Sequence, residues 1–409
     1  MNGPMLRPSR KDVVVIGAGP AGVTAAAAAA SRGAGVVLVE ATHRLGGSVT
    51  AAMHRSLCGL YADDPGETSN TLNGSFQRSL IQRMVDATPN DVRLKPLGKV
   101  WVLEFPTAAY EAALASLIEH PKIERRMDTR VRGVRREGRR IAAVELEGDF
   151  TGWIDTPALI DCTGGGAVLS LIGDDVMQPA DTDRMLGGFG VRLAGISNNP
   201  ELLRLQIPYV LAKAVAAGQL PPLAKFTVFH PGPEADGGVL KMAFDVTRAT
   251  SPWLPDEPNG LVAHATEIAT AILKKIKGEI AELSAATISE ISPRILPRDG
   301  RRLLGRYTLT EDDVLTARQH GGDSVKAWWP AERWDAASGP SYAYPPIGRP
   351  YDIPLDALRS SAIDNLFVAG NTISATAGAA ASSRASGICL ATGAAAGEIA
   401  AESSASICG

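Results

Sequence analysis

Cysteine is scarce in this sequence, and its spacing excludes two kinds of site. The 409 residues include four cysteines. None of them forms a C-x-x-C pair, so neither a zinc knuckle nor a dithiol redox centre is indicated. The histidines likewise lack metal-ligand spacing, and no metal is expected. Cys162 lies in an apolar stretch and is expected to be a buried small hydrophobe. This use of cysteine fits a reducing, cytoplasmic setting.

A strong excess of charge of either sign is also absent. The formal net charge is −3, and both signs are spread along the chain, which gives no electrostatic basis for binding nucleic acid. The basic run at residues 135–140 is interrupted by Glu137 and Gly138. It is predicted to be a solvated turn between strands at 129–134 and 141–147.

Long uninterrupted apolar segments are missing too. Residues 1–11 are polar and lack the apolar core of a signal peptide. The longest apolar run, at 13–30, contains three glycines and a proline. Such a run is a poor membrane span and a good strand–loop–helix unit, so no membrane segment is expected.

A glycine-rich turn stands between an apolar strand and an alanine-rich helix. Residues 12–16 are apolar after the first, as in a strand buried on both faces of a parallel sheet. The turn reads Gly17-Ala18-Gly19-Pro20-Ala21-Gly22. A helix is predicted from there through residue 31, and a second strand at 36–39 leads to Glu40.

Each part of this unit has a physical task in binding a dinucleotide. Gly17 permits the tight turn, Gly19 lets the backbone approach a pyrophosphate, and Gly22 lets the helix pack against the sheet. The helix N-terminus supplies N–H donors and the positive end of a dipole. Glu40 can accept both ribose hydroxyls of an adenosine, and its charge disfavours the 2′-phosphate of NADP. Strand, helix and acid together make the signal stronger than G-x-G-x-x-G alone.

Three further segments resemble the glutathione-reductase-type (GR2-like) flavoproteins. Residues 41–48 (ATHRLGGS) are similar to the stretch whose glycines pass under the flavin pyrophosphate and ring in those proteins. Residues 158–166 (ALIDCTGGG) resemble the strand and A-T-G segment near their adenine end. Residues 364–371 (DNLFVAGN) resemble the strand that brings backbone to the pyrophosphate and ribitol. The helix expected at 382–402 would then point its N-terminal dipole at the flavin N1–C2 carbonyl edge.

More narrowly, the chain resembles the FAD-dependent oxidoreductase family at residues 46–50, 297–314, 351–354 and 365–397, which spread over nearly the whole chain. The resemblance implies FAD as the cofactor. Together with the glycine-rich turn, it implies these FAD-binding residues: Gly17, Gly19, Pro20, Ala21, Gly22, Glu40, Arg44, Gly46, Gly47, Ser48, Val131, Thr163, Gly164, Gly370, Asn371, Gly387 and Ile388.

Features of several better-known relatives are missing. Gly370-Asn371 stands where aromatic hydroxylases of the para-hydroxybenzoate type carry Gly-Asp, and the halogenase-type G-G-G-x-A-G-W loop is absent. His43 lies too near the double glycine to match the covalent histidine of succinate-dehydrogenase-like proteins, and Cys389 is not placed for a thioether, so non-covalent FAD is expected. The sequence has no second strand–GxGxxG–helix unit. A nicotinamide electron partner, NADH or NADPH, would therefore dock transiently against the flavin.

These patterns predict an α/β fold with two domains. The first is a Rossmann-type FAD-binding domain with a parallel sheet, discontinuous in sequence, at residues 10–90, 108–178 and 346–403. The second is a smaller α+β substrate domain with a mixed or antiparallel sheet, at residues 91–107 and 179–345. Its strands are expected at 94–105, 188–193, 224–230 and 238–245, and its long amphipathic helix at 260–283.

Few residues on the substrate side are candidates for catalysis. His54 follows the double glycine by a short loop that should cross the flavin, and it can act as a general base near neutral pH. A solvent-facing loop histidine is the alternative. Arg301 and Arg302 belong to an arginine cluster at 294–306 that suits recognition of a carboxylate or a flavin phosphate. Surface ion pairs with the acidic residues 311–313 would explain most of that cluster.

Aromatic residues gather before the last expected crossing between the domains. They can wall an aromatic or apolar substrate pocket, close it as a lid, or cap the domain junction. They are Trp328, Trp329, Trp334, Tyr342 and Tyr344. A small organic substrate is expected, aromatic if these residues wall its pocket.

Three functions remain open from the sequence. The first is an FAD-dependent oxidoreductase that transfers a hydride between an organic substrate and the flavin N5. The second is a single-component flavin monooxygenase that hydroxylates an aromatic substrate or a tryptophan of a partner protein. The third is a non-catalytic protein that keeps the dinucleotide fold for binding, which the intact glycines near the flavin ring disfavour.

Overall fold

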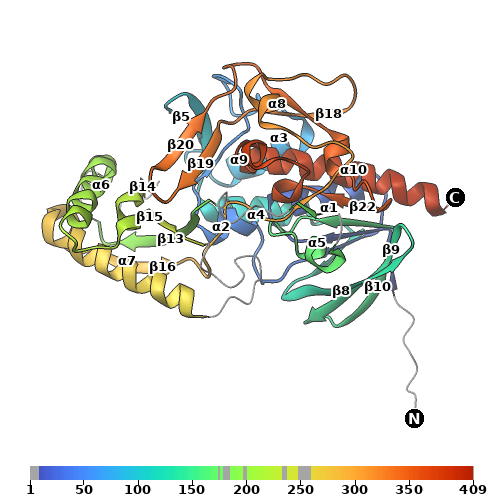
Figure 1. The fold of residues 1–409 in the computed structure, drawn as a ribbon, viewed down its shortest axis with the longest axis horizontal. Coiled ribbons are helices and arrows are strands. Elements are labelled where there is room, and N and C mark those ends of the chain that lie inside the picture. Colours follow the sequence, from blue (N-terminus) through green and yellow to red (C-terminus); the bar gives the residue numbers. More distant parts are fainter. Residues whose placement is uncertain are drawn as a thin grey trace, which may run out of the picture.

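A five-stranded parallel sheet forms the centre of the computed structural model, which describes residues 9–173, 176–177, 185–196, 200–232, 237–246 and 259–408. The strand order is β22 (Leu366–Val368), β11 (Ala158–Asp161), β2 (Val13–Ile16), β3 (Val36–Val39) and β7 (Ile123–Arg126). The first four strands are buried along their length. Both ends of the sequence contribute to this sheet, which confirms the predicted Rossmann-type fold (Figure 1).

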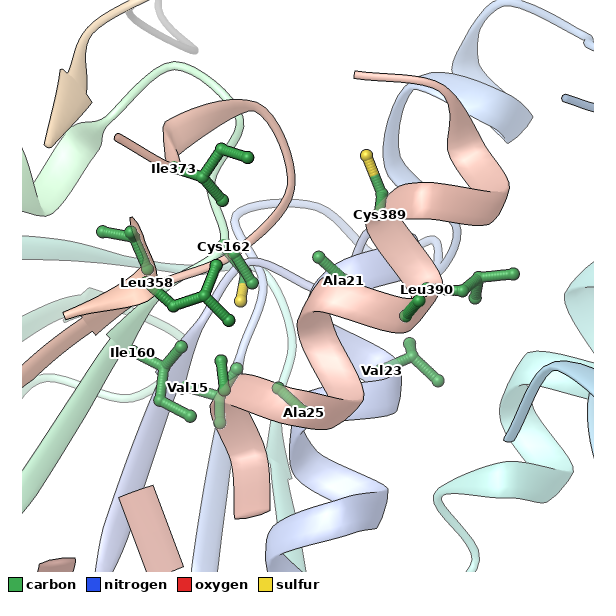
Figure 2. Packing of buried hydrophobic residues seen from close by; sticks show 14 of the residues in the cluster. Val15, Ala21, Val23, Ala25, Ile160, Cys162, Leu358, Ile373, Cys389 and Leu390 are labelled. Carbon is green, nitrogen blue, oxygen red and sulfur yellow. The ribbon is translucent and has the colours of Figure 1, made fainter. Parts of the chain in front are cut away.

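Helices α1 (Pro20–Ser31) and α10 (Ser386–Cys408) lie side by side over this sheet. Small residues allow the contact: a Cβ placed on Gly393 would lie 2.1 Å from the Ala21 oxygen. In Figure 2, Ala21 and Ala25 of α1 lie beside the α10 ribbon. The Thr24 hydroxyl also donates a hydrogen bond to the Leu390 carbonyl (2.8 Å). The C-terminal helix expected at 382–402 begins at Ser386 as α10, and a separate short helix, α9 (Ala377–Ser383), ends just before Arg384.

A second sheet carries the strands β1 (Ser9–Arg10), β10 (Gly152–Asp155), β9 (Arg140–Gly148) and β8 (Thr129–Glu137). The hairpin of β8 and β9 is longer than expected, because most of the basic run at 135–140 continues the two strands. The arginines of that run are exposed or half-buried, in keeping with a solvated hairpin end.

The substrate side contains a four-stranded antiparallel sheet in the order β14 (Val228–Pro231), β15 (Gly237–Phe244), β13 (Gly187–Ala194) and β16 (Thr287–Ile291). Helices α6 (Pro200–Ala216) and α7 (Asn259–Glu279) lie at this end of the molecule, away from α10 (Figure 1). Their apolar side chains and one face of the sheet form a second core. The sheet and α7 were expected from the sequence, whereas α6 was not. The strand expected at 224–230 begins only at Val228, because residues 222–226 form a 3₁₀ turn.

The central parallel sheet and the elements packed on it form the first core, and two segments expected in the substrate domain belong to it. Residues 94–105 are not one strand of the substrate sheet: β5 (Arg93–Leu97) and β6 (Val100–Glu104) form a hairpin that continues with β4 (Ser56–Leu57). The apolar residues of β6 are buried with the central sheet. Leu303, Val314 and Trp328 belong to the same core, so the second core covers residues 189–295 and not 179–345. The domain boundary expected at 178/179 lies outside the described residues.

Short elements complete the described parts of the chain. The helices are α2 (Gly47–Ala51), α3 (Ser75–Ala87), α4 (Thr107–Leu117), α5 (Ala167–Ile172) and α8 (Glu311–Leu315). The two-stranded pairs are β12 (Val176–Met177) with β17 (Arg302–Leu303), β18 (Ser324–Ala327) with β21 (Tyr351–Pro354), and β19 (Ala331–Asp335) with β20 (Gly339–Ala343). Within the described ranges, every helix is too short or too polar to cross a membrane.

Candidate functional site

The glycine-rich turn links β2 to α1 in a conformation that depends on Gly17 and Gly22. Gly17 has φ of +97°, and a Cβ there would lie 2.6 Å from the Cys162 oxygen. A Cβ on Gly22 would lie 1.7 Å from the Gly17 oxygen, so the helix packs directly on the turn. Gly19 is different: it is the N-cap of α1 with φ of −71°, and its Cβ would meet only Gly47 Cα at 3.8 Å. The fold therefore has room for a Cβ at Gly19.

Glu40 stands at the end of β3 and is held against this turn. One carboxylate oxygen accepts a hydrogen bond from the Ala18 N–H (2.8 Å), and the other accepts from the N–H and hydroxyl of Thr42 (3.1 and 3.0 Å). The side chain is half-buried and lines a pocket in front of α1. The sheet thus presents a carboxylate beside the helix N-terminus.

The loop after β3 returns to the same place. Gly46 adopts φ of +95° and caps α2, and a Cβ on Gly47 would lie 2.9 Å from Gly19 Cα. The contact between Gly19 and Gly47 brings the two glycine turns together on one side of the pocket. Ser48, the next residue, also lines it.

A third loop follows β11 and is organised by a buried carboxylate. Asp161 accepts hydrogen bonds from the N–H and hydroxyl of Thr163 (2.9 and 2.7 Å) and from the N–H groups of Val168 and Leu169 (3.0 and 3.2 Å). These bonds fix the turn at Thr163 and Gly164, which reaches the pocket. Burial raises the pKa of Asp161, and these four donors oppose that shift.

The C-terminal part of the chain closes the pocket from the other side. Ala369, Gly370 and Asn371 follow β22 and line it, as do Ser386 and Cys389 in the first turn of α10. Burial raises the pKa of the Cys389 thiol to about 12, so this cysteine is protonated at neutral pH. The first turns of α1 and α10 therefore both open on one pocket, to which each brings the positive end of its dipole.

Most of the FAD-binding residues expected from the sequence line this one pocket. They are Gly17, Gly19, Pro20, Ala21, Glu40, Gly47, Ser48, Val131, Thr163, Gly164, Gly370 and Asn371. Five others do not line it: Gly22, Arg44, Gly46, Gly387 and Ile388. Among these, Arg44 forms ion pairs with Glu111 and with Glu290 (3.5 Å), and the Gly387 N–H donates to the Cys58 carbonyl (2.7 Å).

The three expected catalytic residues lie outside the pocket lining. Arg302 is buried, and its Nε donates to the Ala375 carbonyl (2.7 Å). Arg301 packs at Gly166, where its Cβ would be 2.8 Å from an added Cβ. Two of the acidic residues expected to pair with the cluster at 294–306, Asp312 and Asp313, form ion pairs with Arg318 (2.9 and 3.1 Å).

His54 lies beyond the C-terminal end of α2, and its side chain is exposed to solvent. Desolvation by the protein around it and the positive charges of Lys241, His230, Arg298 and Arg384 lower the pKa of His54. The imidazole is therefore neutral at pH 7. A neutral imidazole in such a place can accept a proton.

Several residues that line the pocket were not predicted from the sequence. They are Thr129, Arg130 and Arg132 of β8, Arg294–Pro297 after β16, and Arg384, Ser386 and Cys389 around the start of α10. Of the residues of β8 that line the pocket, only Val131 was predicted from the sequence. The arginine cluster at 294–306 does reach the pocket, but through Arg294 and not through Arg301 or Arg302. Among the described residues, no group of histidine, cysteine and acidic side chains is arranged to hold a metal ion.

Several solved structures are similar to this chain at low sequence identity. A geranylgeranyl bacteriochlorophyll reductase-like protein from Thermoplasma acidophilum is 12% identical, with 98% of this chain and 79% of that chain covered and a TM-score of 0.47. The myxobacterial chondrochloren halogenase CndH is 15% identical, with 74% and 67% covered and a TM-score of 0.46. PqsL from P. aeruginosa is 12% identical, with 96% and 86% covered and a TM-score of 0.43.

No curated protein sequence matches the chain. The family model for FAD dependent oxidoreductases matches residues 12–408, which is nearly all of the chain. This span includes the glycine-rich turn, the loops that follow β3 and β11, and the start of α10. The chain belongs to the FAD dependent oxidoreductase family, and its cofactor is FAD.

Proposed function

We propose that this enzyme transfers a hydride between a small organic substrate and the N5 of non-covalently bound FAD. The observation that carries the proposal is the pocket in which the first turns of α1 and α10 meet Glu40 and two glycine loops. Lys241, Arg298 and Arg384 lie near one another at the Arg384 end of this pocket. Within the family, the segments at 41–48 and 158–166 support a glutathione-reductase-type arrangement of the FAD-binding parts.

The residues of the pocket fit FAD. Gly19 leaves open a position that a Cβ could fill without a clash, as expected where a pyrophosphate must approach the backbone. We assign the pyrophosphate to the first turn of α1, and the adenosine ribose to Glu40. The segment 369–371 and the first turn of α10 would hold the flavin end. The protonated thiol of Cys389 supports non-covalent binding, because a thioether forms from a thiolate.

FAD, when bound, supplies hydride acceptance or donation at a carbon of the substrate. The protein's own residues position the substrate and manage its proton. We propose that a ring nitrogen of neutral His54 accepts the proton that the reduced substrate loses as its hydride leaves and it becomes oxidised. The apolar walls of the pocket, such as Ile295 and Leu296, exclude water from it.

The division into two domains, the electron partner and the cellular setting also remain proposals. We place the FAD-binding parts around the first core and a substrate-binding part around the second core, at about residues 187–295. A nicotinamide or another electron partner would dock transiently, because the chain has one dinucleotide turn. Cys58, Cys162 and Cys389 are free thiols, which supports a reducing, cytoplasmic setting.

The test is the visible spectrum of the protein under anaerobic conditions, after incubation with FAD and removal of the excess. We expect a bound-flavin band near 450 nm that persists when NADH or NADPH is added, and that bleaches with an organic hydride donor. Rapid bleaching by either nicotinamide, followed by oxygen-dependent hydroxylation, would replace the hydride-transfer proposal with a monooxygenase. A protein that takes up no FAD would overturn the assigned pocket.

Glu40→Arg is expected to weaken FAD binding by about 10- to 100-fold, or roughly 1.4 to 2.8 kcal/mol. The substitution removes the acceptor for the ribose and the acceptor for the Ala18 N–H. The measurement is the dissociation constant for FAD, from quenching of flavin fluorescence. Glu119→Arg, on the surface after α4, is the matched charge-reversal control and should bind FAD normally. Full FAD affinity in Glu40→Arg would contradict the assignment.

A further inference from the structure

The four-stranded substrate sheet has one apolar and one polar face. Phe189, Val191 and Leu193 of β13 are buried in the second core with α6 and α7. Since side chains alternate along a strand, Gly188 and Gly190 lie on the opposite face. In the register of the sheet, Lys241 of β15 stands directly beside Gly190. The polar face therefore combines a lysine with two neighbours that have no side chain.

The end of α2 lies on this polar face. A Cβ on Gly190 would be 2.6 Å from the Ala52 oxygen, so only glycine allows the approach. The Ser292 hydroxyl donates to the Ala51 carbonyl (2.8 Å), and Lys241 Nζ donates to the Ala52 carbonyl. Because α2 begins at the Gly46–Gly47 turn of the FAD pocket, it links that pocket to Lys241. His54, two residues past Ala52, lies near enough to Lys241 for the charge of the lysine to lower the pKa of the imidazole.

Two arginines lie near Lys241 and His54. The Arg298 guanidinium stacks on the Trp334 ring, 4.1 Å from its centroid, and donates to the Leu186 carbonyl. Its Nη2 also lies 3.7 Å from the position of a Cβ on Gly188. Arg384, which lines the FAD pocket, donates to the Glu332 carbonyl (3.0 Å). Cationic groups thus extend from the FAD pocket to the polar face of the sheet.

The carboxylates near this group already have partners. Glu332 lies 3.7 Å from Arg384 and accepts a hydrogen bond from the Trp334 indole N–H (2.6 Å). Glu290 pairs with Arg192 (2.9 Å), and Glu104 pairs with Lys95 (2.8 Å). Among the described residues around this group, positive charge therefore exceeds negative charge. Burial and mutual repulsion lower the pKa of Lys241 well below its usual range, and that of Arg298 to about 9.

We propose that Lys241, Arg298 and His54 form an anion-binding subsite at the Arg384 end of the FAD pocket, which takes the carboxylate of a small organic acid substrate. This proposal rests on the proposed hydride transfer, because the bound acid is a substrate only if the enzyme transfers a hydride to or from it. An ammonium and a planar guanidinium held by an indole ring suit a carboxylate, which accepts at two oxygens. A bound carboxylate would offset the mutual repulsion of these groups.

The experiment is isothermal titration calorimetry of the FAD-loaded protein with benzoate, with benzamide as its neutral counterpart. We expect benzoate to bind at least about tenfold more tightly than benzamide, and Lys241→Met to remove most of that difference. Arg298→Gln should weaken benzoate binding in the same direction. Lys274→Met, an exposed lysine of α7, is the matched control and should bind benzoate like the unmodified protein.

The readout is binding and not turnover, so its failure is distinct from a failure of the hydride-transfer proposal. Flavin content and thermal unfolding of each variant establish that a loss of binding is not a loss of fold. Equal affinity for benzoate and benzamide, or full benzoate affinity in Lys241→Met, would overturn the subsite. Binding of inorganic phosphate in preference to benzoate would overturn its assignment to a carboxylate.

The titration also has a pH signature that a structural lysine would not show. Lys241 is faced by Arg192 on β13, by Arg55 after α2 and by Arg298 before β17. These like charges favour its neutral form, whereas a bound carboxylate favours the ammonium. Benzoate binding at pH 9 should therefore take up protons, measured from the heats in two buffers of different ionisation enthalpy. Lys241→Met should lose most of this uptake.

Discussion

Gly19→Val is expected to abolish the retention of FAD and to leave the protein folded. The backbone at Gly19 has φ of −71°, and an added Cβ would meet only Gly47 Cα at an ordinary distance of 3.8 Å. The fold therefore tolerates a side chain at this position. A pyrophosphate bound to the first turn of α1 would not, because the branched side chain occupies the space in which it must approach the N–H groups. We expect FAD affinity to fall by at least about 100-fold, which corresponds to roughly 2.8 kcal/mol.

The measurement is the flavin content of the purified protein, with the dissociation constant from fluorescence quenching and the unfolding temperature of the apoprotein. Gly321→Val is the matched control, because Gly321 is exposed and a Cβ there has nothing within 4 Å. Gly22→Val should instead fail to fold, because its Cβ would lie 1.7 Å from the Gly17 oxygen. Normal FAD content in folded Gly19→Val would mean that the pyrophosphate binds elsewhere.

The dinucleotide-binding unit could be predicted from the sequence because its determinants are local. A strand buried on both faces, a glycine turn and an alanine-rich helix follow one another within residues 12–31, and the pattern of each is visible in a short window. Glu40 is added by the next strand, whose length fixes its position at the sheet edge. The structure accordingly places Gly17, Gly19 and Glu40 in one pocket.

Residues brought to the pocket from distant parts of the chain were much harder to predict. Arg384 lies in the break between α9 and α10, and the sequence there indicates one continuous helix. Arg294 and Arg301 look alike in sequence, and only the fold shows that Arg294 reaches the pocket. The neighbourhood of His54 and Lys241 depends on the approach of Ala52 to Gly190, which no local pattern encodes. The hairpin at 93–104 was misplaced for a related reason, because a strand pattern does not specify which sheet it joins.

Gly397→Val is expected to destabilise the whole protein, through the contact between α1 and α10. A Cβ on Gly397 would lie 2.2 Å from the Ala25 oxygen and 2.9 Å from its carbonyl carbon. These are backbone atoms, which cannot move aside as a flexible side chain can, so the two helices must separate. Overpacking of this kind costs about 3 kcal/mol or more. Intrinsic helix propensity acts in the opposite direction, because valine is favoured over glycine inside a helix by a few tenths of a kcal/mol.

Overpacking predicts a loss of stability in Gly397→Val and helix propensity predicts a gain. The experiment therefore distinguishes the two effects. The measurement is the midpoint of urea unfolding, and Ala394→Val on the less buried side of α10 is the matched control. By propensity alone the control should lose about 0.5 kcal/mol and Gly397→Val should gain stability. A large loss in Gly397→Val alone would show that the close approach of α1 and α10 stabilises the fold. Because both helices begin at the FAD pocket, their separation should also lower FAD affinity in any variant that remains folded, whereas an unchanged midpoint would contradict the backbone contact at Ala25.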